Sequence, residues 1–204
     1  MKPYRENGII TGASQTGKTL LSMLITLLYT KKGYNMITLD PNHKFANRID
    51  DLPCFSASFV KHTLADIRGL GLEIYQPYEN QETDLENLCG KIKKMRDVCL
   101  VGDEIPNYVK KFKSGNNLDW IVRNGNNFRI GYLFIFQAPQ LVPSDIVRNS
   151  KHRWCFYLDM PTDIKYMKDF IGKEVEEFQT GTEQEYERFG FYKKTGQSAK
   201  RFRI

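Results

Sequence analysis

The feature that most constrains this chain is a glycine-rich stretch near its N-terminus. Residues 12–19 read Gly-Ala-Ser-Gln-Thr-Gly-Lys-Thr and fit the Walker A pattern G-x-x-x-x-G-K-[ST]. The four residues before it, 8–11, predict a short buried strand, and the leucine-rich stretch behind it predicts a helix. Strand, glycine loop and helix in this order form the context in which such a loop binds phosphate.

The residue types in this loop explain how it would bind a nucleotide. Glycines let backbone N–H groups approach a phosphate closely, and the first helical turn adds unpaired N–H groups and a positive dipole end. Lys18 is expected to reach the β- and γ-phosphates, and the Thr19 hydroxyl to help hold Mg²⁺. We therefore expect ATP and Mg²⁺ as ligands, with the nucleotide bound by Gly12, Ala13, Ser14, Gln15, Thr16, Gly17, Lys18, Thr19 and Leu20.

Length and composition indicate a single globular domain over residues 1–204. The chain is 41% hydrophobic and 13% aromatic, which is enough for a full α/β core. Its most apolar stretch, Leu20–Leu28, is too short to cross a membrane, and the N-terminus leaves no room for a signal peptide. The four cysteines lack metal-type spacing, so we expect buried thiols at Cys89 and Cys99 and a reducing cytosol.

Apolar runs without alternation predict parallel strands that are covered on both faces. Such runs lie at residues 36–39, 98–102, 132–136 and 154–158, and a further strand is expected at 72–75. Together with the intervening helical patterns, they predict an α/β fold with a mostly parallel central sheet and helices on both of its faces.

Three helices are predicted between and after these strands. Residues 83–86 have the sequence of a capping box, and the apolar positions from 85 to 95 recur at helical spacing. Further helices are expected at 117–124 and 162–172. The basic C-terminal tail, from about residue 186 to 204, has alternating phenylalanines and is expected to form a terminal hairpin.

Two strand ends carry side chains suited to ATP hydrolysis. Asp103 and Glu104 follow an apolar strand, where the first carboxylate is expected to hold Mg²⁺ opposite Thr19, in the manner of a Walker B motif. Glu104 is expected to orient the attacking water and accept its proton. Gln137 ends the next strand, and since strand ends converge on the ligand crevice of a parallel sheet, we expect its amide to sense the terminal phosphate.

Four motifs in this order resemble the FtsK–HerA superfamily of DNA-pumping ATPases. They are the loop at 12–19, Leu39-Asp40-Pro41-Asn42-His43, the pair Asp103–Glu104, and Phe136-Gln137-Ala138-Pro139. The resemblance covers residues 1–160 and implies a RecA-like P-loop fold. Since the chain is too short for the extra domains of chromosome translocases, it resembles the viral branch of the superfamily, the genome-packaging ATPases.

The resemblance also implies an assembly. Members of the family work as homo-oligomeric rings, in which an arginine from one subunit completes its neighbour's site and stabilises charge on the transferred phosphoryl group. Arg123 is the first candidate for this trans arginine finger and Arg129 the second, with Arg148 and Arg153 as further candidates. The Gly-Arg pair that is frequent in the family is replaced here by Gly125–Asn126.

The implied partner is double-stranded DNA, which would pass through the ring into a capsid. A formal net charge of +6 is compatible with such a polyanion without identifying it. Basic residues in two segments are candidate contacts to backbone phosphates: Lys110, Lys111, Lys113, Lys200, Arg201 and Arg203. The implied place of action is the host cytoplasm at the assembling capsid, with retention in the virion also open. Proteins of the capsid vertex or membrane-associated virion proteins would be partners, without membrane insertion of this chain.

Other classes of P-loop protein remain open on sequence alone. A small nucleoside or nucleotide kinase fits the size, although such kinases usually carry an arginine-rich lid and the arginines here are scattered. A GTPase switch would need an Asn-Lys-x-Asp motif, which this sequence lacks. A P-loop ATPase that does not act on DNA is the third alternative. Tests of phosphoacceptors and of nucleotide preference would separate these classes.

Overall fold

The computed structural model describes residues 7–42, 44–49, 60–77, 83–109, 115–179, 190–195 and 198–203. Its strands are β1 (Gly8–Thr11), β2 (Asn35–Leu39), β3 (Val60–Lys61), β4 (Leu72–Tyr75), β5 (Val98–Gly102), β6 (Ile130–Phe136), β7 (His152–Cys155), β8 (Gly190–Thr195) and β9 (Ser198–Arg203). Its α-helices are α1 (Lys18–Lys31), α2 (Lys44–Ile49), α3 (Asp84–Ile92), α4 (Asn116–Asn124), α5 (Ser144–Arg148), α6 (Pro161–Ile171) and α7 (Glu174–Gln179).

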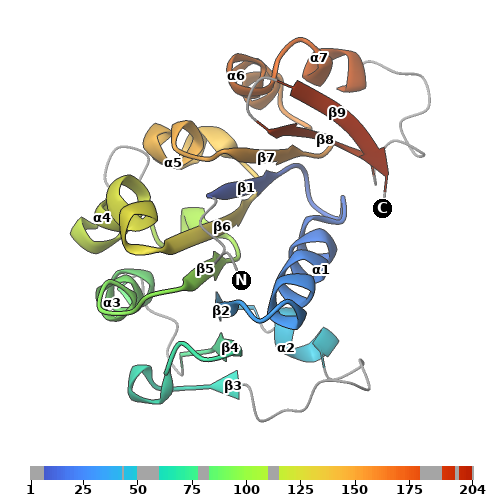
Figure 1. Ribbon diagram of the computed structural model, residues 1–204. Coiled ribbons are helices and arrows are strands. Elements are labelled where there is room, and N and C mark those ends of the chain that lie inside the picture. The colour runs from blue at the N-terminus through green and yellow to red at the C-terminus, as the bar shows by residue number, and fades with distance from the viewer. Residues whose placement is uncertain are drawn as a thin grey trace.

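The strands form one sheet in the order β3-β4-β2-β5-β6-β1-β7-β8-β9 (Figure 1). All pairings from β3 to β7 are parallel, whereas β8 runs antiparallel to both β7 and β9. The predicted mostly parallel sheet is therefore confirmed. At its C-terminal edge, β8 and β9 form an antiparallel hairpin within the segment where the sequence predicted one.

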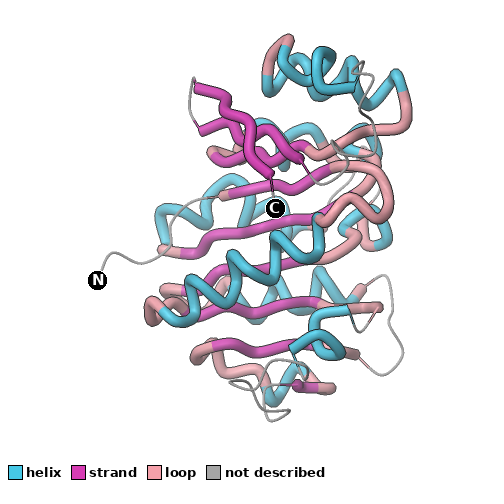
Figure 2. Tube along the Cα trace, turned by 90° about the vertical axis from the view of Figure 1, so that its right-hand side faces the viewer, coloured by secondary structure: helices cyan, strands magenta, loops and turns pink. Residues whose placement is uncertain are grey.

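Helices cover both faces of the sheet, as the uninterrupted apolar strands predicted. Helix α1 lies across one face with α2 near its end, and α3, α4 and α5 lie on the other (Figures 1 and 2). Alternate strand residues divide between two buried clusters: Ile9 and Phe134 pack on the side of α3 and α4, whereas Ile10 and Ile135 pack on the side of α1. Each such fully buried side chain contributes about 1.5–3 kcal/mol to folding.

Strand β7 is shorter than the sequence predicted. The apolar run continues through Leu158, but the strand ends at Cys155 because the chain then turns around the glycine loop. Phe156 N donates to Thr11 O at 2.8 Å, and Ala13 N donates to Tyr157 O at 2.6 Å. Phe156 and Leu158 remain buried, so the apolar run indicated burial rather than strand.

The predicted capping box does not form. Thr83 has helical backbone angles and makes no side-chain cap hydrogen bond to α3. Glu86 instead accepts hydrogen bonds from the backbone N–H groups of Asn117 (2.6 Å) and Leu118 (3.1 Å), and it therefore caps the following helix, α4. A side chain at Gly115 would clash with this carboxylate.

Three cysteines, Cys89, Cys99 and Cys155, are buried free thiols, which confirms the expectation for the first two. Cys54 lies outside the described residues. Among the described residues, no helix is both long and apolar enough to span a membrane.

The role of Glu86 gives a stability prediction. Glu86→Ala removes a charged cap from two N–H groups in the first turn of α4, so we expect the free energy of unfolding to fall by about 1–2 kcal/mol. Thr83→Ala is the matched control and should change it by less than about 0.5 kcal/mol, because its hydroxyl caps nothing. Urea denaturation measures both values. Equal losses of stability in the two variants would support the capping box at α3 and contradict the assignment of Glu86 as the cap of α4.

Candidate nucleotide-binding site

The glycine loop occupies the turn between β1 and α1, as predicted. Gly12 and Gly17 have φ angles of 152° and 97°, a region that side chains rarely adopt. A Cβ atom at Gly12 would lie 2.5 Å from the Cβ of Phe156, so the close approach of the loop to the strand end after β7 requires glycine. The sequence pattern thus specifies both the turn and its packing.

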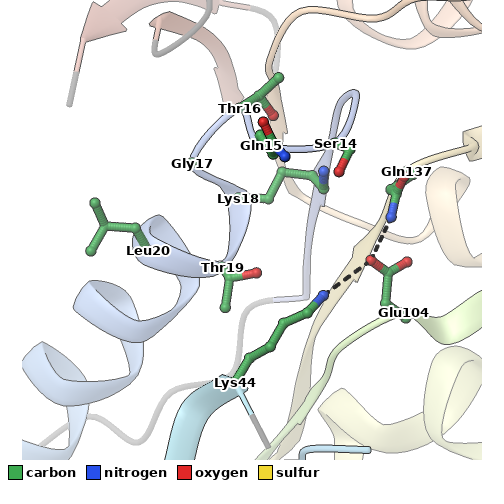
Figure 3. A pocket seen from close by; sticks show the side chains of 10 residues that line it. All are labelled: Ser14, Gln15, Thr16, Gly17, Lys18, Thr19, Leu20, Lys44, Glu104 and Gln137. Carbon is green, nitrogen blue, oxygen red and sulfur yellow. Dashed lines mark hydrogen bonds and ion pairs between the residues drawn. The ribbon is translucent and has the colours of Figure 1, made fainter. Parts of the chain in front are cut away.

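A cavity of about 420 Å³ opens beside this loop, within the usual size range of small-molecule sites. Residues from four elements line it: Ser14, Gln15, Thr16, Gly17, Lys18, Thr19, Leu20, Lys44, Glu104 and Gln137 (Figure 3). Of the predicted nucleotide-binding residues, only Gly12 and Ala13 do not line the cavity; they form the start of the loop. The structure also brings the predicted Glu104 and Gln137 to the same cavity.

The order of the strands explains this convergence. Strands β5, β6 and β1 are neighbours and parallel, so their carboxyl ends meet at one edge of the sheet. Gln137 Nε2 donates a hydrogen bond of 2.8 Å to Glu104 Oε1, which joins the ends of β5 and β6 (Figure 3). The Thr11 hydroxyl donates to Gln137 O at 3.5 Å and joins β6 to β1.

Lys18 is held inside its own loop. Its ammonium group donates to Ala13 O at 2.5 Å, and the Thr16 hydroxyl donates to the same oxygen at 2.9 Å. Burial lowers the pKa of Lys18 to about 8, although the nearby carboxylates of Glu104 and Asp103 oppose this shift. Lys18 is therefore a desolvated cation, which interacts more strongly with an anion than an exposed lysine would.

Asp103 is the buried member of the acidic pair. Its side chain is 1% exposed, and neither carboxylate oxygen has a hydrogen-bond partner among the described residues. Burial raises the pKa of this carboxyl to about 6, with Lys44 as the main opposing influence. Glu104 has left-handed backbone angles (φ 52°, ψ 49°), which are costly for a residue with a Cβ and are often found at functional sites.

The residues present fit Mg²⁺. Within the described ranges, no group of three or more His, Cys, Asp or Glu side chains could hold a metal. Mg²⁺ does not need such a cage, because proteins usually bind it through one or two carboxylates together with substrate phosphates and water. The oxygens of Asp103, which accept no hydrogen bond from the described residues, and the hydroxyl of Thr19 supply donors of the required type. The assignment of both residues as metal ligands stays a prediction.

Lys44, which the sequence prediction missed, is the further cation in the cavity. Its Nζ lies 3.5 Å from Asp103 Oδ2 and 3.6 Å from Glu104 Oε1. The local signal was available, since Asp40 at a strand end followed by Pro41 is typical of a helix start. Asp40 does cap α2, accepting from the N–H groups of Lys44 (2.9 Å) and the next two residues, Phe45 and Ala46 (both 3.0 Å).

The two candidate arginine fingers lie away from this cavity. Arg123, on α4, pairs with Asp145 at 2.7 Å. Arg129 follows α4 and the short 3₁₀ helix 125–128, and its Nε donates to Asp97 Oδ1 at 2.6 Å. It precedes β6, whereas Gln137 follows the strand, and the seven residues of β6 place those ends about 20 Å apart. Neither arginine lines the cavity of its own chain.

The remaining candidates are placed as follows. Arg153 Nε donates to Val147 O at 3.1 Å, and Arg148 lies at the end of α5. Lys110, Lys111 and Lys113 lie outside the described residues, as does His43 of the Asp-Pro motif. Lys200, Arg201 and Arg203 lie on β9, of which the structure describes the backbone path only. Their predicted contacts with DNA stay predictions.

Comparisons with known proteins agree with the fold. No protein-family model matches this sequence, and no curated protein sequence matches it. The genome packaging NTPase B204 of Sulfolobus turreted icosahedral virus 2, in complex with ATPγS, matches the structure with a TM-score of 0.80 and 16% identity. The match covers 100% of this chain and 98% of that chain.

Two further solved structures share the architecture. The DNA-packaging ATPase of Sulfolobus turreted icosahedral virus gives a TM-score of 0.74 and 20% identity, over 100% of this chain and 98% of that chain. VirB4 of Thermoanaerobacter pseudethanolicus gives 0.68 and 10%, over 97% and 89%. The motifs in the sequence already suggest a likeness to the packaging ATPase of such a virus. At these identities the likeness shows the fold, so the chain has the P-loop fold of these ATPases.

The buried Asp103 gives a prediction about stability and pH. Because folding raises the pKa of this carboxyl from 3.8 to about 6, the folded state favours the protonated form. Its contribution is therefore most favourable below about pH 4 and falls as the pH rises to about 6. We expect Asp103→Asn to raise the free energy of unfolding by about 2–3 kcal/mol at about pH 8 and to change it little at about pH 4.

Urea denaturation at the two pH values tests this expectation. Asp169→Asn, at an exposed position on α6, is the matched control and should show no such difference between the two pH values. If Asp103→Asn lowers stability at the higher pH, the carboxylate is stabilised by its surroundings and the raised pKa is wrong.

Proposed function

We propose that this chain is an ATP-hydrolysing motor that translocates double-stranded DNA and packages a viral genome into a capsid. The observation that carries the proposal is the meeting of three strand ends at one cavity. There, the glycine loop, Glu104 and Gln137 lie around the same space, with a hydrogen bond between the last two. This arrangement supplies a phosphate cradle, a base for water and an amide that can report on the terminal phosphate.

The loop residues 12–20 would bind the nucleotide. Backbone N–H groups of the loop and of the first turn of α1 would surround the phosphates. Lys18 would exchange its hydrogen bond with Ala13 O for phosphate oxygens, where its positive charge is more favourable than on a neutral carbonyl. Thr19 and Asp103 would hold Mg²⁺, which when bound neutralises charge developing on the phosphoryl group.

Glu104 would activate the water that attacks the terminal phosphorus atom. As the new P–O bond forms, the bond to the bridging oxygen of ADP breaks, and the proton of the water passes to the carboxylate. The side chain of Glu104 lines the cavity, where Gln137 donates a hydrogen bond to one of its oxygens. Gln137 would exchange this partner when a terminal phosphate is present, which makes it suitable as a sensor.

DNA and other copies of the chain are the proposed partners. Structures with this fold include packaging NTPases and the conjugation coupling protein TcpA, which supports a role on DNA. Arg123 or Arg129 would act on a neighbouring subunit, because both lie away from the cavity of their own chain. We propose action in the cytoplasm of an infected host cell at the assembling capsid, in contact with proteins of the capsid vertex or with membrane-associated virion proteins.

Stimulation by DNA tests the proposed activity. We expect the wild-type protein to hydrolyse ATP faster when double-stranded DNA is added, with a cooperative dependence on protein concentration. Glu104→Gln should lose at least about 100-fold in turnover and still bind ATP, since it removes the base but not the phosphate cradle. Phosphate release and equilibrium nucleotide binding measure the two effects. Full turnover in Glu104→Gln, or no response of the wild type to DNA, would contradict the proposal.

Mixing two inactive variants tests the trans arginine. Lys18→Ala lacks the phosphate-binding cation, and Arg123→Ala lacks the proposed finger; we expect each alone to have little activity. In a mixed ring, an intact Lys18 can face an intact Arg123 from its neighbour, so activity should return to a fraction of the wild-type value. A mixture of Lys18→Ala with Glu104→Gln is the matched control and should stay inactive, because Lys18 and Glu104 line the cavity of one chain and an arginine from the neighbour replaces neither.

Comparison of Arg123→Ala with Arg129→Ala decides which arginine is the finger. If Arg123→Ala alone is fully active whereas Arg129→Ala is inactive and is rescued by Lys18→Ala, the second candidate is the finger. If an inactive arginine variant is not rescued by Lys18→Ala, that arginine acts within its own chain or only in folding.

A further inference from the structure

The backbone at Lys44 is fixed by a buried cap. Asp40, which is fully buried, accepts hydrogen bonds from three successive N–H groups at the start of α2. Gln76 Nε2 donates to the same carboxylate at 3.2 Å from the end of β4. These bonds hold Lys44 at the first position of α2, so its side chain extends from a rigid point at the edge of the cavity (Figure 3).

The ammonium group of Lys44 is loosely held. It lies 3.5 Å and 3.6 Å from the carboxylates of Asp103 and Glu104, beyond the 2.7–2.9 Å of a charge-assisted hydrogen bond. The side chain is 40% exposed and lines the cavity together with Thr19. Lys44 is therefore attracted to the acidic pair without being locked to it, and it can change partner at a low energetic cost.

The charges around the cavity indicate why such a cation is needed. Two lysines, Lys18 and Lys44, offset the two carboxylates of Asp103 and Glu104. A bound nucleoside triphosphate would bring its terminal phosphate, which is its most negative group, next to the carboxylate of Glu104. The neighbouring Gln137 is neutral and cannot offset this repulsion. Lys18 belongs to the loop that surrounds the phosphates, so Lys44 is the cation that approaches the same space from the opposite side (Figure 3).

We propose that Lys44 binds the terminal phosphate of a nucleoside triphosphate and thereby distinguishes ATP from ADP. This inference rests on the proposed function and assigns a specificity-determining residue to the same site. In the structure, Lys44 pairs with Asp103 and Glu104; with a triphosphate bound, its ammonium group moves to the terminal phosphate. The move also leaves Glu104 free to accept a proton from water.

Equilibrium binding of two nucleotides tests the assignment. We compare ADP with β,γ-methylene ATP, which has the terminal phosphate but is not hydrolysed between its β and γ positions, by isothermal titration calorimetry in the presence of Mg²⁺. Lys44→Gln should weaken binding of the triphosphate analogue about 10- to 100-fold and that of ADP by less than about threefold. Lys44→Arg, which keeps the charge, should recover most of the loss. The exposed Lys31→Gln on α1 is the control and should change neither value.

A second variant separates contact with phosphate from mere screening of Glu104, the carboxylate of the pair that lines the cavity. If Lys44 only offsets Glu104, then Lys44→Gln in a Glu104→Gln background should have almost no effect on binding of the analogue. If Lys44 binds the phosphate, the loss should persist in that background at the same size within about threefold.

The possible results are distinguishable. Equal weakening for ADP and the analogue, no change for either, or loss of the effect in the Glu104→Gln background would overturn the role of Lys44 and leave the proposed function intact. A wild-type protein that binds neither nucleotide would overturn both. Selective weakening of the analogue that persists in the Glu104→Gln background supports the assignment.

Discussion

The parallel pairing of β5, β6 and β1 is the constraint on which the rest of the site depends. Both faces of these strands are covered by helices, so nearly all of their side chains are committed to packing. Only the residues just beyond the carboxyl ends can reach a ligand. Because the three strands are adjacent and run in the same direction, the glycine loop, Glu104 and Gln137 must lie near one another. The register of the sheet therefore determines the chemistry available at its edge.

The unfavourable features of the structure are concentrated at that same edge. Asp103 is buried without a hydrogen bond, Glu104 has a left-handed backbone, and burial lowers the pKa of Lys18 to about 8. Each feature costs free energy, which the two apolar clusters on either side of the sheet must offset. A rigid sheet can hold such groups in place, and the same groups become favourable when phosphate and a cation bind between them. The site is thus arranged for its ligands rather than for the stability of the free protein.

Local patterns in the sequence predicted the parts of this site whose physics is local. The glycine loop, the apolar strands and the polar residues that follow them are short-range signals, and the structure places them as expected. The partners of Lys44 and Glu86 were not predicted because they are distant in sequence: Lys44 faces Glu104, and Glu86 caps a helix thirty-one residues away. The end of β7 was also misjudged, since Phe156 lies beyond the strand and is nevertheless buried in the apolar cluster on the α1 side of the sheet. Burial can be predicted from composition, whereas the partner of a polar group cannot.

The positions of the arginines restrict how two copies of this chain could share a site. Arg129 lies at the amino end of β6, about 20 Å from the carboxyl end of that seven-residue strand. Arg123 lies on α4, on the face opposite α1. For Arg123 to reach a cavity in another copy, the side of one molecule that carries α4 must approach the carboxyl edge of the next; for Arg129, the amino edge of the sheet must do so. Such a contact joins different surfaces of two identical chains. Contacts of this kind form a ring when the rotation between copies closes on itself, and an open filament when it does not. The exposed ion pairs of Arg123 and Arg129 are no obstacle, because each contributes only about 0–1 kcal/mol and can be exchanged for a phosphate.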